Sequence, residues 1–462
     1  MRSREMFSRK EWSIKSITRF YARDVLFPGV LQGVCVVRFD YEPGQPSDIV
    51  EVRGGHTVEE AAQVATQVQY PRITHNYPAK TTWNKPWLVN ANPAAYDMWE
   101  FVRSNSNQDL SDLTAGKIKA YEGDARSTWA KPMIVSGPGP RTVPLTKGNH
   151  IDDWGGWSAA AYLDPFIAIP SSITYYTSCL WVQKQVLRVA NLTEKETVIF
   201  LKEVSGLEMK RPIRGTIVQR DRRRPVVADH TVVVMYTLDT VYEDLAYAIF
   251  GLLTSSIYNF FFSLFSTNAH ANFKEILRLP VPIWSPDREK KLANETRTVL
   301  DAYKALYDHE RKYGTDQNQR VSANDVLTST NLPVLRLEEL VLRGDVVMNG
   351  PFNHSLEVLL NKGQLMFNQN LSDDAVQAIK LMSRANGTLT YIKGGKDILV
   401  PNPKIASTFL SKLDAIEKER VTIRQNVSTA QNALDDVVLK AYNITSPSWR
   451  EIVEIGVPWA KN

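Results

Sequence analysis

The feature that most constrains this chain is an uncharged stretch at residues 245–265, which reads LAYAIFGLLTSSIYNFFFSLF. A run of this length could span a bilayer. However, polar residues such as Thr254, Ser256 and Asn259 dilute it, and no loop rich in Lys and Arg lies close to both ends. Apolar residues all round a helix are typical of one that protein covers on every side. We therefore predict a buried central helix over 245–265 and no membrane span.

Length and composition set broader limits. The 462 residues are enough for two or three domains, and a net charge of +5 is too small to identify a partner by itself. The two cysteines, Cys35 and Cys179, exclude a disulfide scaffold and a cysteine-rich zinc site. The basic start of the chain, MRSREMFSRKEWSIKS, lacks the apolar core of a secretory signal. We expect a cytoplasmic protein.

Local patterns predict the other elements. Residues 1–24 are rich in Arg and Lys and favour a short helix, and residues 57–85 turn polar and favour a linker. The β-branched and aromatic residues at 34–41 predict a strand, as do those at 231–236. A weakly periodic helix is expected over 193–205. A charged amphipathic helix should follow Pro286, and a long helix should cover 404–442.

A dense group of cations precedes the strand predicted at 231–236. Within fifteen residues the chain carries Lys210, Arg211, Arg214, Arg220, Arg222, Arg223 and Arg224. Cations this close repel one another unless a polyanion or acidic neighbours compensate. Two interpretations stay open, a solvated turn between two strands and a site of phosphate contact.

The uncharged stretch and the residues after it also follow a recognisable order. A helix with an Asn-aromatic cluster leads into a small-residue loop, a basic residue, the pattern L-x-LP-x-P and a charged helix. The residues in this pattern are Leu252, Leu253, Ser256, Asn259, Phe260, Phe273, Lys274, Leu279, Pro280 and Pro282. This order resembles the target-recognition region of Taq-type adenine-specific DNA methyltransferases and type IIG restriction-modification proteins. More loosely, it is similar to type I specificity subunits.

Three further stretches resemble the same family. They are Phe27, Pro28, Gly29 and Val30 with residues 34–37; Val143, Pro144, Leu145, Lys147, Gly148, Ile151 and Trp154; and Leu434, Asp435, Val438 and Tyr442. The resemblance implies an α+β chain with three parts. Residues 1–75 would be the remnant edge of a methyltransferase α/β sheet, 76–330 a mixed α/β target-recognition domain, and 331–462 a mixed and helical C-terminal region.

The motifs of methyl transfer are missing. The family holds its flipped adenine with a tetrapeptide of Asn, Asp or Ser, then Pro-Pro and an aromatic residue, but this sequence has no Pro-Pro. The string NPAAY at 92–96 lacks the second proline, and no Gly-x-Gly cofactor loop joins a strand to a helix. The seven histidines lack metal-ligand spacing. Asp48 and Glu51, near Arg53, lack the lysine of a nuclease site. We assign no catalytic, cofactor-binding or metal residues.

The first hypothesis is therefore sequence-specific DNA recognition within an adenine-methylating or restriction-modification system. S-adenosylmethionine would bind to a partner catalytic chain or to a missing N-terminal part, and double-stranded DNA is the other expected partner. The predicted DNA-binding residues are Lys147, Lys210, Arg211, Arg214, Arg220, Arg222, Arg223, Arg224 and Lys274. Two alternatives stay open, a non-enzymatic type I-like specificity subunit and a complete but diverged methyltransferase, so enzymatic activity is left undecided.

Overall fold

The chain divides into two compact units. Unit 1 comprises Met1–Leu300 and Ala430–Asn462, and unit 2 comprises Asp301–Thr429. The domain boundaries expected from the sequence stay predictions. The computed structural model describes residues 13–20, 34–42, 48–55, 57–63, 65–69, 93–123, 134–135, 142–146, 148, 151, 166–168, 197–203, 211–219, 227–228, 230–265, 273–313, 334–336, 346–349, 364–367, 399–401 and 406–455.

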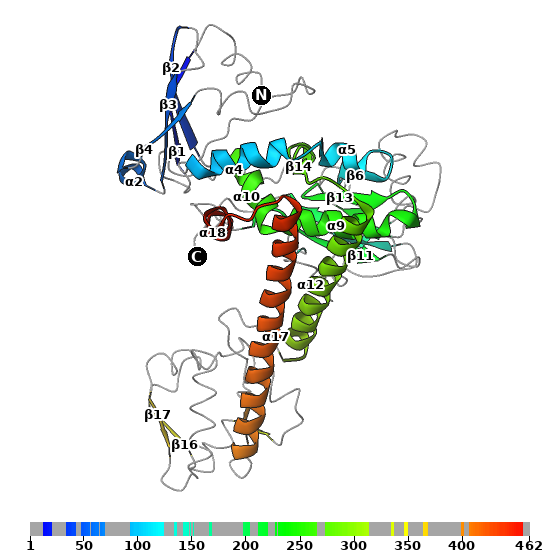
Figure 1. Cartoon of the computed structure of the whole chain (residues 1–462). Coiled ribbons are helices and arrows are strands. Elements are labelled where there is room, and N and C mark those ends of the chain that lie inside the picture. Colours follow the sequence, from blue (N-terminus) through cyan, green and yellow to red (C-terminus); the bar gives the residue numbers. More distant parts are fainter. Residues whose placement is uncertain are drawn as a thin grey trace. The chain divides into compact units, whose positions relative to one another are not determined.

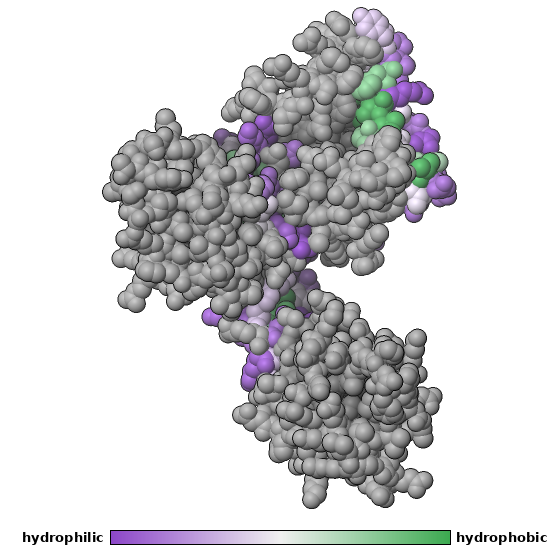
Figure 2. Space-filling view, turned by 180° about the vertical axis from the view of Figure 1, so that it is seen from behind, coloured by the Kyte–Doolittle hydropathy of each residue, from purple (hydrophilic) through white to green (hydrophobic). Residues whose placement is uncertain are grey.

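Unit 1 begins with a four-stranded sheet in the order β2-β1-β3-β4. Its strands are β1 (Ser13–Phe20), β2 (Val34–Asp40), β3 (Ile49–Gly55) and β4 (Ala65–Gln69), with helix α2 (Val58–Gln63) between the last two (Figure 1). Strand β1 is antiparallel to β2 and parallel to β3. Period-2 alternation buries Ile17, Val52 and Val68 on one face. The register places Val36 and Ile49 on the other face, where they are 51% and 47% exposed. Figure 2 shows an apolar area, green at the upper right, with hydrophilic residues beside it.

This sheet corrects two expectations. Residues 13–20, within the predicted helix 1–24, form β1, which buries Ile14, Ile17 and Phe20 and pairs with β2 on one side and β3 on the other, so long-range strand pairing overrides the local pattern. The predicted linker 57–85 begins with helix α2 and strand β4. At 57–69 the polar composition reflects positions that face solvent, and residues 70–85 lie outside the described residues. The predicted strand at 34–41 is confirmed as β2.

A second sheet forms the centre of unit 1. Its order is β11-β10-β13-β6, and all its pairs are antiparallel, with β6 at Ile118–Glu122, β10 at Thr197–Lys202, β11 at Arg214–Gln219 and β13 at Val232–Thr237. The expected helix 193–205 is therefore wrong. The strand TVIFLK buries five consecutive residues. Burial on both faces removes the alternation by which a strand is normally recognised.

A third, smaller sheet has the order β12-β8-β9-β7. Its strands are β7 (Ile134–Val135), β8 (Thr142–Thr146), β9 (Phe166–Ala168) and β12 (Val227–Ala228), and β12 runs parallel to β8. Ala228 packs in a core cluster with Val198, Phe200 and Val234 of the second sheet. This cluster joins the two sheets on one face of the second sheet, while helix α9 covers the other.

The uncharged stretch forms two helices instead of the predicted one. Helix α9 (Glu243–Thr254) is preceded by the short helix η4 (Thr240–Tyr242), and Ser255 alone separates it from α10 (Ser256–Phe265). Ser255 has an extended backbone, and its hydroxyl donates to the carbonyl of Leu252 at 2.6 Å. Serine hydroxyls compete for backbone groups in this way and favour helix ends.

The expected burial of this stretch is confirmed, since all residues of α9 from Leu245 to Thr254 are buried. Gly251 lets α9 pack closely against Thr296, because a Cβ at residue 251 would lie 2.1 Å from Thr296 Oγ1. Within the described part of the chain, no single helix is long and apolar enough to cross a membrane. Together, α9 and α10 pass that test of length and composition as a pair bent by 58°.

Helix α10 lies at the centre of an aromatic core. Phe261 meets Trp99 edge to face at 5.3 Å and Tyr442 at 6.1 Å between ring centroids. Trp99 lies on α4 (Pro93–Ser104), which also contacts α18 (Pro447–Ile455). The buried Arg19 of β1 donates to the carbonyl of Ser263 near the end of α10 at 3.1 Å, where a cation complements the helix dipole. These contacts join the N-terminal sheet, α10 and the end of the chain.

Short elements complete unit 1. They are β5 (Gln108–Asp109), α5 (Leu110–Thr114), α11 (Phe273–Ile276) and β14 (Pro280–Val281). Strand β14 pairs with β5, and Asp109 caps α5 through a capping box with Asp112. The two-residue length of β14 agrees with the expectation that prolines keep this segment out of a central strand.

Two long helices contribute residues to both units, α12 (Pro286–Tyr313) and α17 (Ala406–Ala441). They confirm the two helices predicted from charge and periodicity. Unit 2 also contains β15 (Val334–Arg336) paired with β18 (Leu399–Pro401), and β16 (Val346–Asn349) paired with β17 (Gln364–Phe367). Small mixed sheets followed by a helical C-terminal region confirm the expected α+β class.

Within unit 2, a buried histidine links α12 to α17. His309 is 5% exposed, and its Nε2 lies 4.0 Å from a carboxylate oxygen of Glu419. Burial, and then the positive charge of Arg420, lowers the pKa of His309 below the usual 6.5. Since the folded state favours the neutral imidazole, its contribution to stability is complete above pH 6.5. That contribution is lost as the pH falls from 6.5 through the lowered pKa.

We predict that acid selectively weakens this helix pair through His309. Urea midpoints followed by circular dichroism should fall between pH 8 and pH 5 in the native chain, and His309→Phe should reduce that fall. His230, which is exposed, provides the matched control, and His230→Phe should leave the pH dependence unchanged. An identical fall for His309→Phe and the native chain would contradict the assignment.

Candidate nucleic-acid interface

The predicted DNA-binding residues fall only partly within the described structure. Arg211, Arg214 and Lys274 are described, and Lys274 is exposed on α11. The others lie outside the described residues, namely Lys147, Lys210, Arg220, Arg222, Arg223 and Arg224. Their roles as DNA contacts all stay predictions. The described strands nevertheless show which sheets lie before and after these residues in the chain.

Strand β11 divides the basic run into two groups. Arg214 is its first residue, and Arg220 directly follows its last residue, Gln219. Six residues of extended chain span roughly 17–20 Å, about twice the distance over which salt screens charges in physiological solution. Arg214, at the start of β11, is therefore more than one screening length away from the other end of the strand. Arg211 and Arg214 stand at one end of β11, and four arginines follow the other end.

The connection that carries these four arginines is anchored on both sides. Before it, β11 pairs with β10 along its whole length, from Arg214 opposite Lys202 to Gln219 opposite Thr197. After it, β12 pairs with β8, Val227 opposite Leu145 and Ala228 opposite Thr146. Lys147 directly follows the last residue of β8. The arginines thus connect two sheets that share one core.

The glycine after Lys147 has a clear structural reason. The amide of Gly148 donates to Thr231 Oγ1 at 2.8 Å, and a Cβ at Gly148 would lie 3.0 Å from the backbone oxygen of Thr231. Ile151, three residues on, is 1% exposed and belongs to the core cluster of the second sheet. Gly148 and Ile151 of the K-G-x-x-I stretch are therefore held close to the residues that lead into β13.

The structure also brings Lys202, which the sequence alone did not single out, close to one of the predicted DNA-binding residues. Lys202, the last residue of β10, lies directly opposite Arg214. Like charges directly opposite one another across a ladder are destabilising. Only strand pairing brings these residues together, and no short-range sequence pattern could have shown it.

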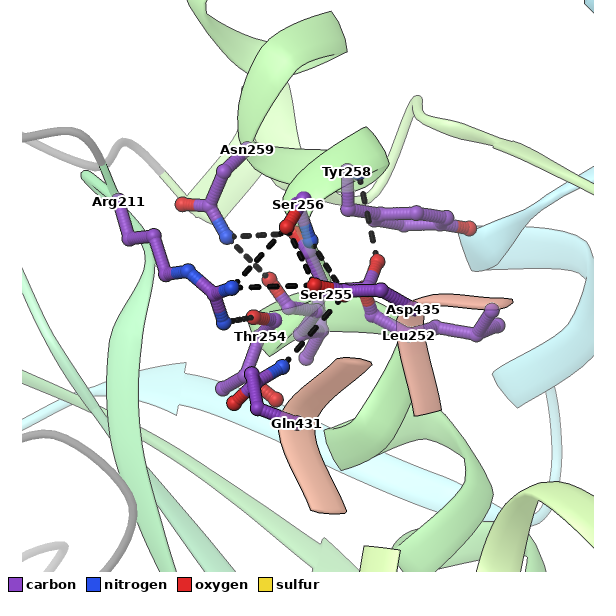
Figure 3. A network of polar contacts seen from close by, with 10 residues as sticks. Arg211, Leu252, Thr254, Ser255, Ser256, Tyr258, Asn259, Gln431 and Asp435 are labelled. Atoms are coloured by element: carbon purple, nitrogen blue, oxygen red, sulfur yellow. Dashed lines mark hydrogen bonds and ion pairs between the residues drawn. The ribbon is translucent and has the colours of Figure 1, made fainter. Parts of the chain in front are cut away.

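Arg211 is already engaged inside unit 1. Its guanidinium donates to the carbonyl of Thr254 at 3.1 Å, to Ser256 Oγ at 3.0 Å and to Asp435 Oδ2 at 3.1 Å (Figure 3). Thr254 ends α9, where the helix dipole favours a cation. These contacts tie Arg211 to the break between α9 and α10.

Asp435 of α17 completes the same junction from the other side. It accepts hydrogen bonds from the amide of Ser256 at 2.8 Å and from the Ser256 hydroxyl. Ser256 begins α10, so the carboxylate caps a helix N-terminus, where a negative charge is favourable. The Arg211–Asp435 ion pair therefore joins two charges that each complement a helix end.

Asn259 provides further hydrogen bonds to backbone groups at the break. It is 1% exposed, and its Oδ1 accepts from the amide of Ile213 at 2.6 Å. Its Nδ2 donates to the carbonyls of Leu253 at 3.2 Å and Ser255 at 2.9 Å. Helix ends leave such groups unsatisfied, and burying them unpaired is costly. We call Arg211, Ser256, Asn259 and Asp435 the junction network.

Residues from two of the stretches that resemble the family contact each other beside the junction network. The hydroxyls of Tyr258 and Tyr442 both donate to the carbonyl of Pro280, the former at 3.0 Å. Burial raises the pKa of both tyrosines well above the usual value, so both stay protonated donors at neutral pH. Motif residues from 256–282 and 434–442 thus share one core, although the sequence analysis matched them separately.

The described residues once considered for nuclease or methyl-transfer chemistry have structural roles. Glu51 pairs with Arg53, Pro93 begins α4, and Tyr96 is 2% exposed in the core. Among the described residues there is no group of three or more His, Cys, Asp or Glu side chains that could hold a metal ion. The location of a cofactor site stays a prediction.

Comparison with known proteins gives distant structural likenesses only. No protein family matches the sequence, and no curated protein matches it. The fold is similar to the type IIL restriction-modification enzyme MmeI in complex with DNA, with 11% identity and a TM-score of 0.32, over 89% of this chain and 46% of that one. It is also similar to a type I restriction-modification S subunit from M. genitalium, with 10% identity and a TM-score of 0.30, over 72% and 96%. The chain thus spans about half of the length of MmeI. With TM-scores this low, neither likeness assigns a function.

Proposed function

We propose that this chain binds double-stranded DNA as the target-recognition part of a restriction-modification system that methylates adenine. The observation that carries the proposal is the connection with Arg220, Arg222, Arg223 and Arg224, which joins two anchored strands, β11 and β12. Four guanidinium groups on one short connection suit a phosphate backbone. Convergence of the family-like residues Asn259, Pro280 and Asp435 on one core supports the family part of the proposal.

The salt dependence of DNA binding tests this proposal. Each phosphate contact contributes about 0.9 to the slope of log K against log salt concentration. Replacing the four arginines with alanine should therefore flatten the slope by up to about 3.6 and weaken binding to any duplex alike. Replacing them with lysine keeps the charge and provides the control, with most of the slope retained. An unchanged slope in the alanine variant would contradict phosphate contact.

Methyl transfer, in this proposal, needs S-adenosylmethionine bound by a partner chain or by a segment outside this sequence. The purified chain should show no saturable heat of binding with S-adenosylmethionine, while DNA binding persists at low salt and is lost at high salt. Tight cofactor binding together with methyl transfer by the chain alone would favour the third hypothesis, a complete but diverged methyltransferase.

One observation favours the alternative of a type I-like specificity subunit. Helices α12 and α17, of 28 and 36 residues, lead into and out of a second compact unit. Two recognition units connected by long helices are what that class requires. A footprint with two separate protected segments on the target DNA would support it, and a single segment would support the first hypothesis.

A further inference from the structure

Two residues outside the predicted DNA-binding set hold the beginning of the strand that leads to the four arginines. Asn259 accepts from the amide of Ile213, the residue immediately before β11. Asp435 pairs with Arg211, three residues before β11. Of the three residues that precede the strand, two are therefore fixed to the junction of α9, α10 and α17.

Strand β11 can transmit this position to its other end. All six of its residues pair with β10, and Ile217 and Thr216 are buried. At Gly215 a Cβ would lie 2.6 Å from the carbonyl oxygen of Phe200, so the strand lies tightly against its neighbour. A packed strand of this kind moves as a body, because interiors are close-packed and deform little.

We propose that Asp435 and Asn259 are positioning residues for DNA binding, which place the arginine-bearing connection through β11 without touching DNA themselves. The inference rests on the proposed function and adds a dependence of DNA affinity on α17. Asp435 sits far along the chain from the arginines, and its ion pair with Arg211 brings α17 to the residues that lead into β11.

The test is Asp435→Asn, with Asp436→Asn as the matched control. Asp436 is the next residue of α17, but it pairs with Lys440 of the same helix and Arg450 of α18. Removing a negative charge should by itself slightly strengthen binding to a polyanion. We expect Asp436→Asn to bind DNA at least as tightly as the native chain, and Asp435→Asn to bind about 5- to 20-fold more weakly with a flatter salt slope.

A double-mutant cycle separates positioning from general destabilisation. Measured well below the unfolding temperature, Asp435→Asn should weaken DNA binding in the native background and have little further effect once the four arginines are alanine. Equal penalties in both backgrounds, or native affinity for folded Asp435→Asn, would overturn the inference. If Asp435→Asn does not fold, Ser256→Ala takes its place, because it removes the hydroxyl that Asp435 and Arg211 share.

The cycle also distinguishes this inference from the function on which it rests. If the arginine variant binds like the native chain, the proposed phosphate contact fails and positioning fails with it. If the arginine variant loses binding while Asp435→Asn and Ser256→Ala keep it, only positioning fails.

Discussion

Replacing Phe261 with aspartate is expected to abolish folding of unit 1. Phe261 is 0% exposed and packs against Trp99 of α4 and against Tyr442, which directly follows α17. Removing a large buried side chain costs about 3–5 kcal/mol, and an unpaired buried charge costs several more. The sum approaches the whole stability of an ordinary domain, about 5–15 kcal/mol.

Circular dichroism and recovery of the chain after lysis without detergent test this expectation. The native chain should stay in the supernatant, and Phe261→Asp should aggregate or lack cooperative unfolding. Val241, which is 73% exposed in the same unit, provides the control, and Val241→Asp should fold normally. A folded Phe261→Asp, or native chain found in the membrane fraction, would show that α10 is not the core helix described above.

The second large effect is expected at Asn259. Asn259→Leu keeps the volume but removes the side-chain partner of the Ile213 amide and of the Leu253 carbonyl, while the Ser255 carbonyl keeps its bond from the backbone amide of residue 259. Each unsatisfied buried group costs about 1–3 kcal/mol, so the loss of two partners should lower the free energy of unfolding by roughly 2 kcal/mol or more. A urea midpoint measured by tryptophan fluorescence would show the loss directly.

Asn259→Asp sharpens the same test, because the carboxylate retains an acceptor for Ile213 but faces two carbonyl oxygens. It should be about as destabilising as the leucine variant. Asn294, exposed on α12, offers the matched asparagine, and Asn294→Leu should change the midpoint little. If Asn259→Leu has the same urea midpoint as the native chain, the break between α9 and α10 does not depend on this side-chain amide.

Some of this protein is determined by the sequence alone. The apolar content of 245–265 predicts burial, because a helix without a polar face needs protein on every side. The charge pattern after Pro286 and the helical periodicity over 404–442 predict α12 and α17, since helical spacing is a local property. The dense arginines before Val227 are likewise visible in the sequence.

Other features depend on long-range contacts that no local pattern records. The strand β10 has neither alternation nor clear period, because both its faces are covered by residues distant in sequence. The break at Ser255 is stabilised by Arg211 and Asp435, which approach it from 43 and 179 or more residues away. Tertiary structure alone decided that these charges cap helices, and that Lys202 lies opposite Arg214 at the start of β11.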